Sequence, residues 1–309
     1  MALTNFFHSG AGIVQLSDLN CYVLSYFTPA GAYAVSSNSV SAFTQFWFDP
    51  SAPLSLPPRL AYMPAAGGNP GRLFVTWNSG GSINIGELAL GITGNSLTSI
   101  TGLVGNPAVL NGPSTPSAPC IAVSGNQVVV AYELPDHTID MAVSNDLVAD
   151  PKAFTFTLVG GLYQADGITK ETTGASPSIV AAPGGVYLAW QGYDIHSDPP
   201  QSIEDVTVGG YTVGSGLASL FYTTLQGLTD TPPALTYANN ELYLLFCQPV
   251  DQHLCIWPQA HWPTVAALFL APTTHQQPSL CPSTDGTQLV MAWTGDDTNQ
   301  TINVAFQPF

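Results

Sequence analysis

The sequence predicts an all-β protein, a six-bladed β-propeller, because one pattern of apolar runs, turns and aromatic residues recurs along it. Six apolar runs end on an aromatic residue, and these residues lie 47 to 58 positions apart. They are Tyr26, Trp77, Tyr132, Trp190, Phe246 and Trp293. A period of about 50 residues built from short strands is typical of propeller blades. We therefore expect residues 1–309 to form one domain of six four-stranded antiparallel blades.

Each repeat indicates four strands. The first follows a recurrent proline, as at 178–181, and a turn rich in Gly, Asn and Pro comes next, as at 183–185. The second is the run that ends on the aromatic residue, and its continuous hydrophobicity suits a strand covered on both faces. The third is typified by 302–305. The fourth is weaker in the sequence and is expected at 42–46, 153–156, 217–221 and 267–270.

The two ends of the sequence predict how the ring closes. The last repeat stops after its third strand at Phe309, while residues 2–7 have the composition of a fourth strand. We expect this N-terminal strand to complete the last blade, since closure leaves only short blade edges unpaired.

Composition excludes several classes of partner. Twenty acidic side chains face only four basic ones, for a net charge of −16. Binding to nucleic acid depends on basic residues that neutralise phosphates, so we expect no nucleic-acid partner. Anionic membrane surfaces are excluded for the same reason, and no apolar run reaches the roughly 20 residues of a membrane helix.

The first residues lack the basic start and long apolar stretch of a secretory signal. The protein is therefore expected to stay in the cell, to leave by an unusual route, or to be a trimmed form of a secreted chain. Five cysteines do not suggest a disulfide framework. Cys247 and Cys255 flank one predicted hairpin and either pair or, as we favour, remain buried thiols. The sequence holds no CxxC, HExxH or Gly-rich phosphate loop, so we expect no cofactor and no metal site.

One segment resembles a known family. Ser283, Asp285 and Gly286 precede a strand ending in Trp293, which is similar to the Asp-box turn of sialidase-like propellers. Residues 292–296 with 302–304 look like the repeat of sialidase- and lectin-like propellers. The resemblance implies a β-propeller fold. It does not extend to sialidase activity, which needs three arginines around the substrate carboxylate, because the chain has two arginines in total.

The hairpin between the second and third strands carries the candidate ligand-binding residues. Three successive repeats place an aspartate close to a histidine there, and the last repeat offers Asp296 and Asp297 without a histidine. These residues are Asp136, His137, Asp194, His196, Asp251, His253 and Asp296. We expect them on one face of the ring, where they present hydrogen-bonding groups to a sugar. The alternative is structural, since aspartate in a tight turn bonds its own backbone. A shared metal is disfavoured because equivalent hairpins lie far apart around a ring.

The six tryptophans divide into two sets of three, and Trp47, Trp257 and Trp262 fall outside the repeat pattern. Trp77, Trp190 and Trp293 end the second strands and are expected to pack between blades. Trp257 and Trp262 lie beside prolines close to the His253 hairpin, and we assign them as candidates for stacking on a sugar ring.

These observations favour a lectin-like protein that binds a glycan or small-molecule ligand without turnover, and no catalytic residue is assigned. The competing function is a glycoside hydrolase or lyase with an axial site built from two carboxylates, with or without Ca²⁺. A scaffold for protein partners is the third class. Candidate carboxylates for the enzyme are Asp18, Asp166, Glu171, Glu204, Asp205 and Asp285.

Overall fold

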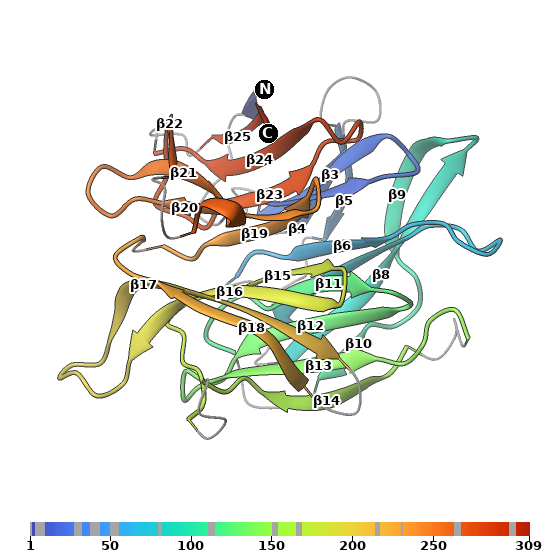
Figure 1. The fold of residues 1–309 in the computed structure, drawn as a ribbon. Coiled ribbons are helices and arrows are strands. Elements are labelled where there is room, and N and C mark those ends of the chain that lie inside the picture. The colour runs from blue at the N-terminus through green and yellow to red at the C-terminus, as the bar shows by residue number, and fades with distance from the viewer. Residues whose placement is uncertain are drawn as a thin grey trace.

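The computed structural model describes most of the chain. The described residues are 2–3, 10–27, 33–37, 44–49, 56–79, 82–110, 115–149, 154–164, 169–213, 217–229, 231–262, 267–296 and 301–309. They form an all-β propeller in which consecutive strands pair antiparallel to make each sheet (Figure 1). One short 3-10 helix, η1 (Gln259–His261), interrupts the strands, and no helix of the described residues is long and apolar enough to cross a membrane.

Four sheets are built from four strands that follow one another along the chain. Their strands are β2 (Gly12–Leu16), β3 (Cys21–Phe27), β4 (Tyr33–Ser37) and β5 (Thr44–Asp49); β11 (Cys120–Ser124), β12 (Gln127–Glu133), β13 (Ile139–Ser144) and β14 (Phe156–Gly161); β15 (Ser178–Ala182), β16 (Gly185–Asp194), β17 (Gln201–Val213) and β18 (Leu217–Leu225); β19 (Ala234–Ala238), β20 (Glu241–Cys247), β21 (His253–Pro258) and β22 (Leu268–Thr273).

A fifth four-stranded sheet joins the two ends of the chain. Its strands are β23 (Ser279–Pro282), β24 (Gln288–Thr294), β25 (Ile302–Pro308) and β1 (Ala2–Leu3). In β1, Ala2 lies opposite Asn303 and Leu3 opposite Ile302. The rest of the N-terminal segment expected to pair there, residues 4–7, lies outside the described residues.

The prediction of six four-stranded blades is wrong, because the described residues form five four-stranded blades. The remaining sheet has five strands, which are β6 (Arg59–Met63), β7 (Arg72–Ser79), β8 (Ser82–Thr93), β9 (Ser96–Leu103) and β10 (Ala108–Leu110). Strand β8 is 12 residues long, and two strands share its outer edge. Residues 83–85 of β8 pair with β10, and residues 88–93 pair with β9. Gly94, in the turn that joins β8 to β9, has a φ of 61°.

The first strand of every sheet lies innermost. Each contacts the next in a closed cycle of β2, β6, β11, β15, β19, β23 and β2 again. Their register is the same throughout, since the residue that opens each inner strand lies opposite the residue just before the repeat aromatic. Arg59, for example, lies opposite Thr76, and Ser178 lies opposite Ala189. The repeat aromatics therefore mark a real structural equivalence.

The core lies between neighbouring sheets. Trp190 is fully buried among residues of the two sheets that begin with β11 and β15. Trp77 and Trp293 are 9% and 7% exposed, so all three repeat tryptophans are core residues, as predicted. The first and last sheets share a core as well, in which Leu24 packs in one cluster with Val290.

The strand order gives the ring two different faces. We call the face with the loops between second and third strands the hairpin face, and the opposite face, with the turns between first and second strands, the turn face. The loops β16–β17 and β20–β21 project to the left of Figure 1, and the β6–β7 turn projects to the right.

Candidate functional site

The predicted pair Asp136 and His137 lies in the loop between β12 and β13. Asp136 Oδ1 accepts hydrogen bonds from the backbone N–H and the hydroxyl of Thr138, at 3.1 and 2.7 Å. These bonds, the hydroxyl bond first, hold the pKa of Asp136 below its usual value. The carboxylate therefore serves its own turn, which is the structural role that the sequence left open.

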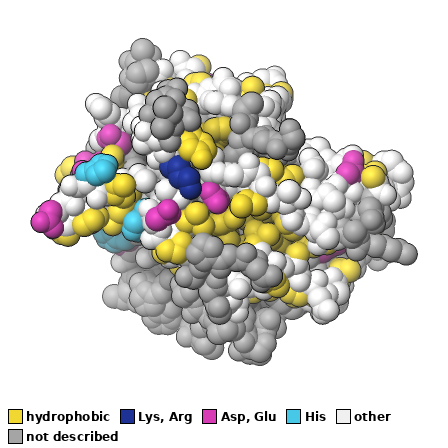
Figure 2. Space-filling view, turned by 90° about the horizontal axis from the view of Figure 1, so that it is seen from below, with side chains coloured by type: hydrophobic (Ala, Val, Ile, Leu, Met, Phe, Trp, Pro, Cys, Tyr) yellow, Lys and Arg dark blue, Asp and Glu magenta, His cyan; other side chains and the backbone are white. Residues whose placement is uncertain are grey.

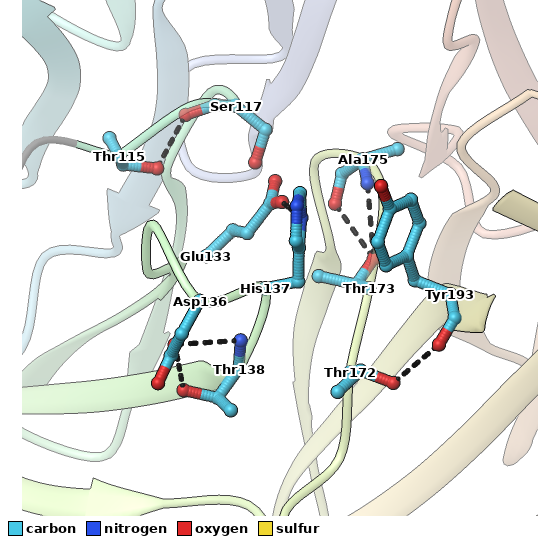
Figure 3. Close-up of polar contacts among 10 residues, drawn as sticks. All are labelled: Thr115, Ser117, Glu133, Asp136, His137, Thr138, Thr172, Thr173, Ala175 and Tyr193. Carbon is cyan, nitrogen blue, oxygen red and sulfur yellow. Dashed lines mark hydrogen bonds and ion pairs between the residues drawn. The ribbon is translucent and has the colours of Figure 1, made fainter. Parts of the chain in front are cut away.

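His137 contacts the neighbouring sheet (Figure 3). Its Nδ1 lies 2.7 Å from Oε1 of Glu133, and its ring lies against Tyr193 with centroids 4.0 Å apart. Glu133 is buried, and burial raises its pKa while the Ser117 hydroxyl and His137 act in the opposite direction. This arrangement fixes the loop to the sheet of β15–β18.

The other two pairs repeat the turn geometry of Asp136. Asp194 Oδ1 accepts the N–H of His196 at 2.8 Å, and Asp251 Oδ1 accepts the N–H of His253 at 3.2 Å. Asp296 lies 3.7 Å from Nε2 of His275. Each of these aspartates lies in or beside the loop of a different sheet, on the hairpin face.

The two candidate stacking tryptophans lie against each other. Trp257 belongs to β21, is 6% exposed and packs in the core with Phe246, at a centroid separation of 6.3 Å. Trp262 is half-buried after η1, and its indole N–H donates to the carbonyl of Trp257 at 3.0 Å. Trp262 thus keeps some surface for a ligand, whereas Trp257 offers little.

The candidate carboxylates are dispersed, and the side chains of four of the described ones have local partners. Tyr62 Oη donates to Asp18 at 2.5 Å, Tyr222 Oη donates to Glu171 at 2.7 Å, and the Gly227 N–H donates to Asp205 at 2.9 Å. Asp285 accepts from Ser283 and Thr287 within its own turn. Asp166 lies outside the described residues. Glu204 and Asp205 both belong to β17.

Two cavities follow the ring axis, one at the level where the inner strands begin and one where they end. The first has a volume of about 80 Å³ and the second about 260 Å³. Neither has an aspartate or glutamate among the described residues that line it. In the same part of the chain no group of three His, Cys, Asp or Glu side chains is arranged to hold a metal ion.

A pocket larger than these two cavities lies on the turn face, between the sheet of β6–β10 and the sheet of β11–β14. Its volume is about 450 Å³. Arg72, which opens β7, and Glu87, in β8, both line it and form an ion pair with Nη2 and Oε2 2.5 Å apart. Their side chains are only 12% and 20% exposed. A second guanidinium nitrogen donates to the carbonyl of Leu147 across the sheet boundary at 3.3 Å.

An aromatic ring packs against the Arg72–Glu87 ion pair, and a turn of the neighbouring sheet forms the opposite wall of the pocket. The Arg72 guanidinium lies 5.1 Å from the ring centroid of Phe74, and Phe74 stacks on Phe154 at 5.6 Å. Across the pocket, Asp146 accepts the N–H groups of Val148 and Ala149, so a fixed turn forms this wall. The rest of the lining is largely aliphatic, including Met63, Pro64, Pro70, Val104, Leu147 and Val148. Such a pocket combines a few fixed polar groups with an apolar wall, as ligand sites do.

Sequence reasoning missed Arg72 and Glu87 as site residues, although a signal was present. Arg72 is one of two arginines in the chain, and it opens an apolar strand run. Glu87 interrupts another strand run, 82–93. A charged residue in a strand that is otherwise apolar has to find a partner, and two of them 15 positions apart fit one hairpin.

Comparison with known proteins supports the fold. No family model matches the chain, and no curated protein matches it. The resemblance to sialidase-like repeats therefore has no support from a family model, whereas solved propeller structures align over most of the chain.

An α-L-arabinanase of Penicillium chrysogenum, solved with arabinobiose, is 14% identical at a TM-score of 0.67, covering 100% of this chain and 98% of that one. AofleA of Arthrobotrys oligospora is 10% identical at 0.64, covering 99% and 88%. The lectin of Aleuria aurantia, solved with Fucalpha1-6GlcNAc, is 12% identical at 0.52, covering 85% and 78%. At these identities the similarity shows the propeller fold alone.

Proposed function

We propose that this protein is a lectin-like propeller that binds a neutral carbohydrate in the pocket at Arg72 and Glu87. The observation that carries the proposal is the ion pair at the bottom of a pocket of about 450 Å³ with aliphatic walls. A carboxylate accepts hydrogen bonds from two adjacent hydroxyls, while a guanidinium donates to ring or hydroxyl oxygens. The aliphatic wall suits the C–H face of a sugar, and a pair of zero net charge suits an uncharged ligand.

We expect one such site per chain, because the arginine of this pocket is not repeated in the other sheets. The residues that open the second strand in the other sheets are Cys21, Gln127, Gly185, Glu241 and Gln288, none of them an arginine. The repeated Asp–His loops were predicted to present hydrogen-bonding groups to a sugar. The Asp carboxylates of those loops already accept hydrogen bonds from their own backbone, which leaves them less able to bind a ligand.

The similar structures include proteins of both classes considered for this chain, an arabinanase and lectins. Hydrolysis of a glycosidic bond needs a general acid and a second carboxylate about 5 to 10 Å apart. The Arg72–Glu87 pocket has Glu87 as its one lining carboxylate among the described residues. This favours binding over turnover, and a hydrolase remains the second candidate because an arabinanase aligns over the whole chain.

Calorimetric titration with a panel of neutral mono- and disaccharides, including arabinose, arabinobiose and fucose, tests the proposal. We expect one site per chain, and Glu87→Gln should weaken it at least tenfold, because a lost hydrogen bond to a charged group amounts to about 1.5–3 kcal/mol. Arg72→Met should have an effect of similar size. Asp136→Ala and Asp251→Ala, on the opposite face, serve as matched controls and should leave affinity unchanged.

Two outcomes would contradict the proposal. Loss of binding in the aspartate variants with full binding in Glu87→Gln would move the site to the hairpin face. Release of new reducing ends from arabinan or another polysaccharide, by the wild-type protein, would make it an enzyme.

A further inference from the structure

The second arginine of the chain, Arg59, occupies the ring axis. It opens β6, and the residues that open the other inner strands are all small: Gly12, Cys120, Ser178, Ala234 and Ser279. The shared register places these residues at one level, where they line the cavity of about 80 Å³. One long cationic side chain therefore occupies the space that the small residues leave.

Arg59 is tied to the ring through Gln277. Its Nη2 donates to Oε1 of Gln277, and the Gln277 amide donates to the carbonyls of Ser176 and Pro233 at 3.2 and 2.9 Å. Segments leading into four inner strands thus share one polar network. Gln277 is a neutral acceptor, so it orients the guanidinium without balancing its charge.

No described carboxylate pairs with Arg59, although acidic residues outnumber basic ones fivefold in the sequence. Burial lowers the pKa of Arg59 to about 10, which still leaves it protonated at neutral pH. Burial raises the pKa of the neighbouring Cys120 thiol to about 12, so this group is neutral there. Arg59 is half-buried at the cavity. A cation with restricted access to water is costly without a counter-charge.

The rest of the cavity offers hydrogen-bond donors. Ser178 Oγ accepts the N–H of Leu235 at 2.9 Å, and Ser279 Oγ accepts the N–H of Ile13 at 3.0 Å, which leaves each O–H free to donate. The guanidinium has five N–H groups, and Gln277 accepts from one nitrogen. A space of about 80 Å³ holds a few water molecules or one small ion, and is too small for a sugar ring.

From this cation, these donors and this volume, we propose that the axial cavity binds one small monovalent anion, of halide size, against the Arg59 guanidinium. The site is independent of the carbohydrate pocket, since Arg59 and Arg72 lie at opposite ends of the β6–β7 pairing, where Arg59 faces Thr76 and Arg72 faces Met63. The anion would supply the counter-charge that the chain itself does not place there. An ion that binds the folded ring and not the unfolded chain stabilises the fold.

Crystals grown without halide and soaked in sodium bromide test the site directly, by anomalous scattering at the bromine edge. We expect a peak within hydrogen-bond distance of Arg59 and near Ser178 and Ser279. A cavity filled by water alone at molar bromide would overturn the proposal. This experiment uses the wild-type protein and does not depend on any variant folding.

Thermal unfolding gives the second measurement. At constant ionic strength, replacing gluconate by bromide should raise the Tm of the wild-type protein with the logarithm of the bromide concentration. Arg59→Gln should abolish this dependence, whereas Arg72→Gln, the matched control, should retain it. An equal bromide dependence in Arg59→Gln and wild type would show that the effect arises elsewhere on the protein, and would contradict the proposal.

Discussion

The imidazole of His137 lies on the ring of Tyr193, with the two ring planes inclined by 31° and the centroids 4.0 Å apart. The two residues belong to different sheets. Beside this contact, the backbone N–H of Thr173 donates to the His137 carbonyl at 2.8 Å. The loop between β12 and β13 is therefore part of the contact between two sheets, which explains its histidine without any ligand.

Replacing His137 by Asn should lower the free energy of unfolding by about 1–2 kcal/mol, since it removes the ring contact and the Glu133 partner. Asparagine is chosen because His137 has a φ of 65°, which Asn tolerates better than Ala. Urea denaturation measures the change. His196→Asn is the control, because His196 is exposed and should change stability by less than about 0.5 kcal/mol. Equal effects of the two substitutions would contradict a structural role for His137.

Asp136 should contribute to stability in a pH-dependent way. Its pKa is lowered in the folded protein, so its contribution is fully present above the unfolded pKa of 3.8 and is lost as the pH falls through the folded value. Asp136→Ala should therefore destabilise the protein by roughly 1 kcal/mol at pH 7 and by less at pH 3. Asp136→Asn keeps an acceptor oxygen without the charge and should reduce this pH dependence. The same loss at both pH values in Asp136→Ala would mean that the charge has no part in it.

Replacing Trp190 by Ala should cost about 3–5 kcal/mol, since it leaves a large cavity among side chains of two sheets. Trp190 is fully buried, whereas Trp262 is half-buried and should cost clearly less. Chemical denaturation followed by circular dichroism compares the two variants. A Trp190→Ala protein as stable as the wild type would show that the sheets do not depend on this contact.

The cysteines should be unreactive in the folded protein. All five are free and buried, and burial raises the pKa of Cys120 and of Cys255 to about 12, so almost no thiolate exists at neutral pH. Ellman's reagent at pH 8 should react slowly with the native protein and should count five thiols after denaturation. Fewer than five thiols without a reducing agent would reveal a disulfide.

The propeller fold could be predicted from the sequence because each second strand carries its own pattern. The apolar run ending at Trp190 becomes β16 and the run ending at Trp293 becomes β24, and both are core strands. The sheet of β6–β10 could not be predicted in the same way. Its outer strands are short or half-exposed, and nothing in the local sequence shows that β9 and β10 share the edge of β8.

The candidate site was harder to predict, since it depends on contacts between sheets. The Asp–His repetition was visible in the sequence. Whether these aspartates bind a ligand or stabilise their own turn depends on the partners of their carboxylates. Asp136 and Asp194 accept hydrogen bonds from backbone N–H groups of their own turns, and Asp136 also accepts one from the Thr138 hydroxyl. The pocket needs Leu147 from one sheet beside Arg72 from another. Likewise, the axial position of Arg59 follows from ring geometry and has no signature in the residues around it.

The contact between the first and last sheets has a consequence for synthesis of the chain on the ribosome. The Ile13 N–H donates to Ser279 Oγ, and Leu24 shares a core cluster with Val290, so residues more than 260 positions apart cover each other. During translation, the side of the first sheet that packs against the last sheet stays exposed until the last sheet has left the ribosome. Because contacts of such long sequence separation form late and leave apolar surface exposed in the meantime, the nascent chain should be a client of chaperones that shield apolar strands.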